Sequence, residues 1–408
     1  MTLHRDQPAP EPPATTLDCL IVGGGIHGVH VAARLIGEAG IPADRLRILD
    51  PGARLLERWR SRTATTGMSH LRSPSVHHLD LDPMSLQRFA GKRTRRTAGL
   101  FTPPFERPAL ELFNAHCDHV EEAFGLAALH LRDRAVGCAV DETGVEVELG
   151  GGGVVRTDHL VLAMGIGERP RWPDWAPRED PGIHHVFDPG FDDWPVDRSS
   201  VAVVGGGISA GHVALRLLSE GHRVELVSRH PLRQHQFDSD PGWLGPKFNM
   251  KFHREPDFDR RRAMITEARH VGSVPPEMGR ALRRAIARGR LAWREHRVTG
   301  LERTTAGLRL SLDQAEALEV DRVLLATGFE SARPGGPMID HLVRSESLPC
   351  AGCGYPIVDA CLRWHPRILV TGPLAELELG PVSRNIAGAR RAGDRIVEAL
   401  SPPRRAAV

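Results

Sequence analysis

Apolar runs that end in glycine alternate along the chain with longer segments whose apolar positions recur at helical spacing. The first run, "LDCLIVGGG", starts at Leu17 and is followed by "VHVAARLIGEAG". An apolar run, a glycine turn and an amphipathic segment predict a buried strand, a tight turn and a helix. The same order returns in "VAVVGGGISAGHVALRLLSEGHRVELVSRH", residues 201–230. The chain is therefore predicted to be an α/β protein built around two similar strand–turn–helix units.

The first glycine turn fits the G-x-G-x-x-G pattern of dinucleotide-binding units. Gly23 would make the turn, Gly25 would let a pyrophosphate approach the backbone, and Gly28 would let the helix pack on the strand. The next expected strand, "RLRILDPG", ends at Asp50, whose carboxylate can accept hydrogen bonds from a ribose hydroxyl pair. This unit is predicted to bind a dinucleotide with a free 2′-hydroxyl group.

The second turn has the related pattern Gly205, Gly207 and Ala210, but its next strand, "RVELVSRH", ends without an acid. Arg229 stands near the position that Asp50 has in the first unit. A guanidinium offers forked donors to phosphate oxygens, so this position favours the 2′-phosphate of NADPH, although an ordinary exposed arginine remains the alternative. The two turns would serve one reaction if FAD stays bound in the first unit and accepts a hydride from NADPH that binds transiently in the second.

The order of segments predicts two Rossmann-like domains, with the NADPH domain inserted into a discontinuous FAD domain. We expect the first part of the FAD domain at 17–194, the NADPH domain at 195–330, and a C-terminal return at 331–408 through "RILVTGPL". Residues 1–16 are proline-rich and polar, which is typical of a disordered tail. A helix is expected at 108–124, and a small antiparallel element is expected just before Gly165. Further expected contacts with the nucleotides come from glycines and a threonine at strand ends: Gly165, Thr327 and Gly328.

Composition narrows the function further. The 408 residues carry a formal net charge of +2, which argues against a nucleic-acid-binding protein. No apolar run is long enough to span a membrane, and six cysteines in so long a chain are not a disulfide framework. We therefore expect a cytoplasmic protein whose partners are small molecules, and the sequence leaves a homo-oligomer open.

The paired turns, the "ATG" of 326–328 and the closing "TGP" resemble flavoproteins with two dinucleotide-binding domains. Within that group the chain is most similar to the flavin-dependent N-hydroxylating monooxygenases, the lysine and ornithine N-hydroxylases. The similar motifs are "GISA" with Ser209, "LATGF", and "TGMSHLRSPSVHHLDLDPMSLQRF" with Met68. The sequence departs from the group at Ile26, where proline is usual. It also lacks, between 165 and 201, the F-x-G-x-x-x-H motif that is typical of the broader flavin monooxygenases.

The resemblance implies FAD and NADPH as cofactors, with Met68 near the flavin and Gly372 in the closing motif. It also implies a monooxygenase that acts on a small, nitrogen-containing metabolite with oxygen, through a peroxyflavin. The alternative is a flavin reductase or dehydrogenase that passes electrons to a carrier or a thiol partner. The cofactor supplies the chemistry in either case, so no catalytic side chain is assigned.

Three other segments are candidates for chemistry. "ELGPVSRN", 378–385, is expected to open the final helix at Gly380, so that its N–H groups face the flavin or simply cap the helix. "FDSDPGWLGPKFNMKF", 237–252, is expected to be a non-periodic loop at the nicotinamide or substrate mouth, or packed between domains, with Trp243, Lys247 and Asn249 as candidates. "CAGC" (Cys350 and Cys353) has redox spacing, although two buried or incidental cysteines are the alternative. "HCDH" at 116–119 lacks a second ligand pair, so no metal is expected.

Overall fold

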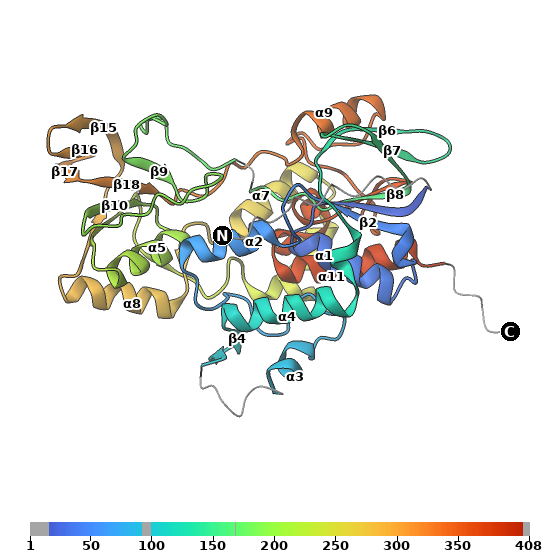
Figure 1. The fold of residues 1–408 in the computed structure, drawn as a ribbon, viewed down its shortest axis with the longest axis horizontal. Helices are drawn as coiled ribbons and strands as arrows, with labels where there is room; N and C mark the ends of the chain where they lie inside the picture. The colour runs from blue at the N-terminus through green and yellow to red at the C-terminus, as the bar shows by residue number, and fades with distance from the viewer. Residues whose placement is uncertain (1–15, 92–98, 168, 403–408) are drawn as a thin grey trace, which may run out of the picture.

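The computed structural model describes residues 16–91, 99–167 and 169–402, so nearly all of the expected N-terminal tail lies outside the described residues. Two α/β units lie side by side in it (Figure 1). Each has a sheet with a central parallel strand that ends in glycine, β1 (Leu17–Val22) or β10 (Ser200–Val204). Each strand leads through its glycine turn into a helix, α1 (Ile26–Gly37) or α5 (Ile208–Ser219). The predicted α/β fold with two Rossmann-type units is confirmed.

The sheet of the first unit runs in the order β19-β20-β8-β1-β2-β5, with β6 and β7 added beside β8. Its strands are β2 (Leu46–Leu49), β5 (His130–Leu131), β6 (Ala135–Val140), β7 (Val145–Leu149), β8 (Val154–Leu162), β19 (Arg363–His365) and β20 (Ile368–Val370). Strands β6, β7 and β8 pair antiparallel, as the alternating apolar pattern before Gly165 indicates.

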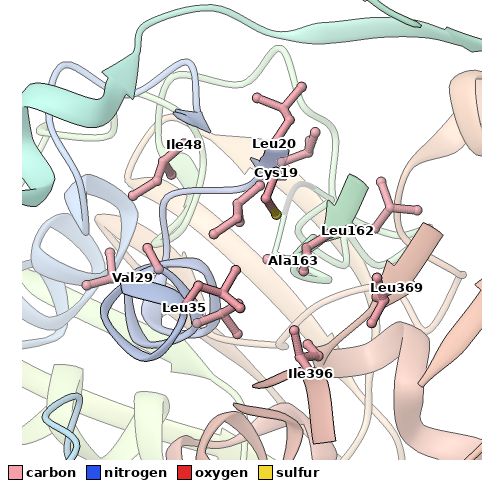
Figure 2. Packing of buried hydrophobic residues seen from close by; sticks show 14 of the residues in the cluster. Cys19, Leu20, Val29, Leu35, Ile48, Leu162, Ala163, Leu369 and Ile396 are labelled. Carbon is pink, nitrogen blue, oxygen red and sulfur yellow. The ribbon is translucent and has the colours of Figure 1, made fainter. Parts of the chain in front are cut away.

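The core of the first unit joins segments from opposite ends of the chain. Figure 2 shows side chains of one buried cluster: Leu20 belongs to β1, Val29 and Leu35 to α1, Leu369 to β20, and Ile396 to α11 (Ile386–Leu400). Strand β20 pairs in parallel with β8, and α11 packs against α1. Because β1 is covered on both faces, its run of apolar residues is continuous rather than alternating.

The sheet of the second unit runs in the order β14-β11-β10-β18-β9. Its further elements are β9 (Ile183–His185), β11 (Arg223–Ser228), β14 (Leu291–Glu295), β18 (Arg322–Leu325) and α8 (Pro276–Ala287), with an antiparallel layer of β15 (Val298–Thr304), β16 (Gly307–Leu312) and β17 (Ala315–Val320). Strand β9 pairs with β18, so the expected boundary between 194 and 195 lies too late in the chain. A strand of three residues has too little periodicity to show which sheet it joins.

The remaining segments cover and connect the two units. They are α2 (Glu57–Thr66), α3 (Ser85–Gly91), α4 (Leu110–Ala123), α6 (Pro246–Arg254), α7 (Phe258–Ala268), α9 (Gly336–Ser345), α10 (Glu376–Leu379) and the short pairs β3 (Phe101–Thr102) with β4 (Arg107–Pro108) and β12 (Arg233–Gln234) with β13 (Ser273–Val274). Helix α4 confirms the helix expected at 108–124. None of the helices in the described ranges has the length and apolar character that a bilayer crossing requires.

The structure corrects two expected local structures. The segment 237–252 is not an irregular loop, because 241–244 form a 3₁₀ turn and α6 begins at Pro246, a first helical position where the missing N–H costs nothing. The final helix begins at Ile386 and not at Gly380. A 3₁₀ turn occupies 381–384, and the side chain of Asn385 caps α11 by accepting a 2.9 Å hydrogen bond from the Gly388 N–H.

Helix α2 of the first unit makes contacts that hold the two units together. The guanidinium of Arg62 lies over the ring of Phe329, 4.6 Å from its centroid. From the second unit, Arg216 of α5 donates to the Thr65 carbonyl at 2.9 Å, and its guanidinium lies 3.8 Å from the ring centroid of Trp194. The last turn of α5 is thereby fixed against the end of α2.

Candidate functional site

A cavity of about 500 Å³ opens between the first glycine turn, helix α2 and the start of α5. Its volume is within the range of cofactor sites, which is about 300 to 1,000 Å³. The lining comes from both units: Gly23, Gly24, Gly25, Ile26, His27, Asp50, Glu57, Arg62, Thr66, Met68, Asp133, Arg134, Gly165, Phe187, Ile208, Ser209, His212, Phe329, Pro373 and Arg384 are among its residues. Of the residues predicted to contact the flavin or its ribose, Asp50, Met68 and Gly165 lie here.

The first glycine turn has the geometry that a pyrophosphate needs. Gly23 has φ +115°, and a Cβ there would lie 2.5 Å from the Ala163 carbonyl oxygen. A Cβ on Gly28 would lie only 1.8 Å from the Gly23 oxygen, whereas a Cβ on Gly25 would meet no atom within 4 Å. Gly25 precedes α1 and caps it with no side chain, so the first N–H groups of the helix remain available to an anion. The turn therefore fits a dinucleotide phosphate at Gly25.

Asp50 orders the turn as well as lining the cavity. Its carboxylate accepts one hydrogen bond from the Gly24 N–H at 2.7 Å and another from the Gly52 N–H at 2.8 Å. Each carboxylate oxygen has a second lone pair, so the group retains acceptors for a ribose hydroxyl pair. The position at the end of β2, one strand from β1, is the one that the sequence predicts for this contact.

The second turn repeats the backbone geometry of the first. Gly205 has φ +155°, and a Cβ there would lie 2.5 Å from the Ala326 carbonyl oxygen. A Cβ on Gly23 would lie at the same distance from the Ala163 carbonyl oxygen. Ala210 is buried in the contact between helix and strand, where Gly28 lies in the first unit. A Cβ on Gly207 would lie 3.6 Å from the Cα of Gly272, so the loop that contains Gly272 contacts this turn.

Arg229 follows β11 and is exposed, without a hydrogen bond or ion pair to any residue of the described ranges. The preceding Ser228 is buried, and its hydroxyl accepts from the Trp293 ring nitrogen at 3.0 Å and donates to the His230 carbonyl. The serine is occupied in the fold, whereas the guanidinium is free for a ligand. This arrangement is compatible with the 2′-phosphate contact predicted for Arg229.

The start of α5 contributes Ile208, Ser209 and His212 to the cavity of the first unit. Burial lowers the pKa of His212 to about 4, so its ring is neutral near pH 7. The helix that follows the second turn thus lines the cavity at the first turn. Sequence patterns could place Ser209 in a turn, but they could not show that the helix following one turn lines the site of the other.

Other predicted residues lie outside this lining. Thr327 donates to the Arg171 carbonyl, and Gly328 accepts from the Arg171 N–H at 2.9 Å. A Cβ on Gly372 would face the His27 ring at 3.7 Å, and one on Gly380 would face Trp243 at 3.5 Å. Both distances are ordinary van der Waals contacts, whereas the positive φ of Gly372 (+64°) and of Gly380 (+77°) favours glycine at these positions.

The three predicted substrate residues also lie away from the cavity. Trp243 is buried in a separate apolar cluster with Phe252, Tyr355 and other side chains. Asn249 donates to the Trp243 carbonyl at 2.8 Å and to the Gly245 carbonyl at 2.9 Å, which braces the start of α6. Lys247 is exposed, with its ammonium 4.7 Å from the Phe248 ring centroid.

Two cavity residues were missed by the sequence reasoning. His27 lies inside the first glycine motif, and its Nδ1 makes a 2.8 Å hydrogen bond with the Thr371 hydroxyl of the C-terminal return. Burial lowers the pKa of His27 to about 4. Arg384 is the last residue of the 3₁₀ turn before α11, and its side chain lines the cavity. The sequence indicates helix N–H groups at this place instead. No pattern in the sequence "SRN" at 383–385 predicts that Arg384 lines the cavity.

Within the ranges that the structure describes, no cluster of three or more histidine, cysteine, aspartate or glutamate side chains could hold a metal ion. His116 of the "HCDH" segment is buried, its pKa is lowered to about 3 by burial, and its Nε2 bonds to the Ser85 hydroxyl at 2.9 Å. All six cysteines are free, and neither Cys350 nor Cys353 lines the cavity.

Comparisons with known proteins agree with this architecture. Residues 20–167 match a family model described as FAD-NAD(P)-binding, and residues 130–257 match one described as pyridine nucleotide-disulphide oxidoreductase. No curated protein matches the sequence.

Solved structures resemble the whole chain. The ornithine hydroxylase of Pseudomonas aeruginosa is 18% identical, with a TM-score of 0.74 over 95% of this chain and 99% of that one. The ornithine N-hydroxylase of Kutzneria sp. 744, solved with reduced FAD, NADP+ and L-ornithine, has the same four values. The bacillithiol disulfide reductase of Bacillus cereus is 17% identical, with a TM-score of 0.61 over 95% of this chain and 99% of that one. The chain therefore has the fold of the flavoproteins with two dinucleotide-binding domains, and its first domain is of the FAD/NAD(P)-binding type.

Proposed function

We propose that the protein is an FAD-dependent, NADPH-using monooxygenase that oxygenates the nitrogen of a small metabolite. One observation carries the proposal: the start of α5, directly after the second glycine turn, lines the cavity of the first turn. If NADPH binds at Gly205 and Gly207, its nicotinamide would therefore lie close to the flavin of an FAD whose pyrophosphate binds at Gly25. Two independent nucleotide sites would not require α5 to line the cavity of the first unit.

The chain's own residues have distinct roles in this proposal. Gly25 and the first N–H groups of α1 would bind the pyrophosphate of FAD, and Asp50 would bind its ribose. Arg229 would bind the 2′-phosphate of NADPH. Met68 and Phe329 would help to exclude water from the inner end of the cavity. Bound FAD would supply the redox chemistry, which is hydride uptake from NADPH and activation of oxygen.

The alternative is a reductase that passes electrons to a thiol partner. The cysteine pair is the feature that favours it, but Cys350 and Cys353 lie outside the cavity lining. The bacillithiol disulfide reductase also superposes less closely than the ornithine hydroxylase, with TM-scores of 0.61 and 0.74. These observations support oxygenation of an amine as the first function to test, with ornithine, lysine and cadaverine as starting substrates.

We further propose that the protein works in the cytoplasm on freely diffusing metabolites and oxygen. Six free cysteines suit a reducing compartment, which also supplies NADPH. The homo-oligomer left open by the sequence stays a prediction.

The test is product analysis under isotopically labelled oxygen. The FAD-loaded protein is mixed with NADPH and each amine, and the products are analysed by mass spectrometry. Gain of one labelled oxygen atom by an amine, with matching NADPH consumption, is the expected result. Reduction of a low-molecular-weight disulfide, with no labelled product from any amine, would replace this proposal with the reductase.

A further inference from the structure

A fully buried carboxylate lies beside the cavity, within a group of three arginines. Glu376 is 0% exposed, and the Nε and Nη2 atoms of Arg384 donate to its two oxygens at 2.6 and 2.7 Å. Arg269 donates to the same carboxylate at 3.0 Å, and Arg262 bonds to it as well. Arg262 lies on α7 and Arg269 directly follows that helix. The group therefore joins α7 to α10 of the C-terminal return (Figure 1).

The group has more positive than negative charge. Burial alone would raise the pKa of Glu376, but the hydrogen bonds from Arg384 and the charges of the three arginines outweigh burial and hold that pKa below its usual value. The carboxylate is therefore ionised and neutralises only one of three guanidinium groups. The charge of Asp238 also acts on Arg269, so among the described residues the three guanidinium groups of this cluster face two carboxylates. A desolvated positive charge of this kind favours an anionic ligand.

Arg384 is the member of the group that reaches the cavity. Its bidentate pairing with Glu376 fixes the guanidinium plane, and the Tyr355 hydroxyl accepts a further, longer bond at 3.4 Å. The adjoining Ser383 hydroxyl donates to the Gly372 carbonyl, which anchors the backbone. The remaining nitrogen, Nη1, has no hydrogen-bond partner within the described ranges, and the side chain lines the cavity.

Arg384 of the C-terminal return and Ser209 of α5 line the same cavity as Asp50. If the ribose of FAD binds Asp50 and its pyrophosphate binds Gly25, the remaining part of the cavity receives the flavin. Hydride transfer from NADPH brings two electrons and one proton, so one net negative charge must be accommodated there. We propose that Arg384 is the fixed cation that stabilises the reduced flavin, and that Glu376 is the positioning residue that holds it. This inference rests on the proposed function, because it requires bound FAD.

The test compares the midpoint potential of bound FAD in matched variants. Arg384→Met removes the cation at the cavity. Arg262→Met is the control, because Arg262 pairs with the same carboxylate and has a similar side-chain exposure, 21% against 19%, but does not line the cavity. We expect Arg384→Met to lose at least tenfold in the preference for reduced over oxidised FAD. That loss is a potential about 30 mV lower for a two-electron couple.

Each outcome decides the proposal. An unchanged potential in Arg384→Met overturns it, and so does an equal fall in Arg262→Met, because the effect would then not depend on the position facing the cavity. Arg384→Lys keeps the charge and is expected to lie close to the wild type; a fall as large as that of Arg384→Met also overturns the proposal. If Arg384→Met does not fold, Arg384→Gln takes its place with the same criteria. A wild-type protein that binds no FAD would instead refute the proposed function.

Discussion

The two glycines of the first turn have opposite predicted sensitivities to a methyl group. Gly28 supports the fold, because a Cβ there would lie 1.8 Å from the Gly23 carbonyl oxygen. Gly25 supports the ligand, because a Cβ there would meet no protein atom within 4 Å and its φ of −82° suits any residue. Gly28→Ala and Gly25→Ala therefore separate stability from cofactor binding within a single motif.

The magnitude for Gly28→Ala follows from the overlap. To reach an ordinary contact, α1 must move away from β1 by more than about 1 Å, and overpacking of this kind costs about 1–3 kcal/mol or more. A domain of this size loses about 2–4 °C in Tm for each kcal/mol. Gly25→Ala is expected to cost the apoprotein less than about 1 kcal/mol, as a change at a helix N-cap. Its FAD affinity should nevertheless fall at least tenfold, because the methyl group occupies the space of the phosphate.

Thermal unfolding of the apoproteins and FAD titration of each variant provide the assay. Ala210→Gly is the control in the second unit, where a methyl group already fits the equivalent contact; its FAD affinity should match the wild type. The reasoning is refuted if Gly28→Ala is as stable as the wild type. It is refuted equally if Gly25→Ala lowers the apoprotein Tm as much as Gly28→Ala or binds FAD with wild-type affinity.

Three further predictions concern the second unit and the buried polar groups. Arg229→Ala should reduce the ratio of kcat/KM for NADPH to that for NADH by at least tenfold, because a charge-assisted phosphate contact is lost; an unchanged ratio would show that Arg229 does not read the 2′-phosphate. Asn249→Ala should lower the free energy of unfolding by about 1–3 kcal/mol through the loss of two buried hydrogen bonds, and should leave the KM for an amine substrate unchanged. A raised KM with wild-type stability would restore the predicted substrate role. The protein should also lose stability in mild acid, because burial lowers the pKa of four fully buried histidines to about 3 or 4: His30, His78, His116 and His185. These rings stay neutral in the fold while the unfolded chain takes up protons below about pH 6.5, so each costs about 1.4 kcal/mol per pH unit as the pH falls towards its folded pKa. Urea unfolding at about pH 7.5 and 5.5 should differ by several kcal/mol, and equal midpoints would contradict this account.

The sequence alone determined the two nucleotide-binding turns. Gly23, Gly28 and Gly205 are required by contacts with atoms of the adjoining strands and turns, so their spacing carries the information without reference to the rest of the fold. Asp50 and Arg229 follow from the same local rule, since each comes at the end of the strand next to its turn. The apolar runs of β1, β8 and β20 likewise predicted buried strands, because a strand covered on both faces has few polar positions.

Only the tertiary structure decided what surrounds those turns. Glu376 binds Arg262 and Arg269, more than a hundred residues earlier in the chain, and His27 bonds to Thr371, more than three hundred residues later. Polar contacts between distant residues leave no periodic pattern in the sequence. Each involves single polar side chains that come together only when segments far apart in the chain pack against each other. For the same reason, the sequence "PKFNM" predicts a loop although it begins α6. The contribution of α5 to the cavity of the first unit likewise has no sequence pattern. The motifs predict which ligands the chain can hold, and the packing of the two units decides that α5 lines the cavity at the first turn.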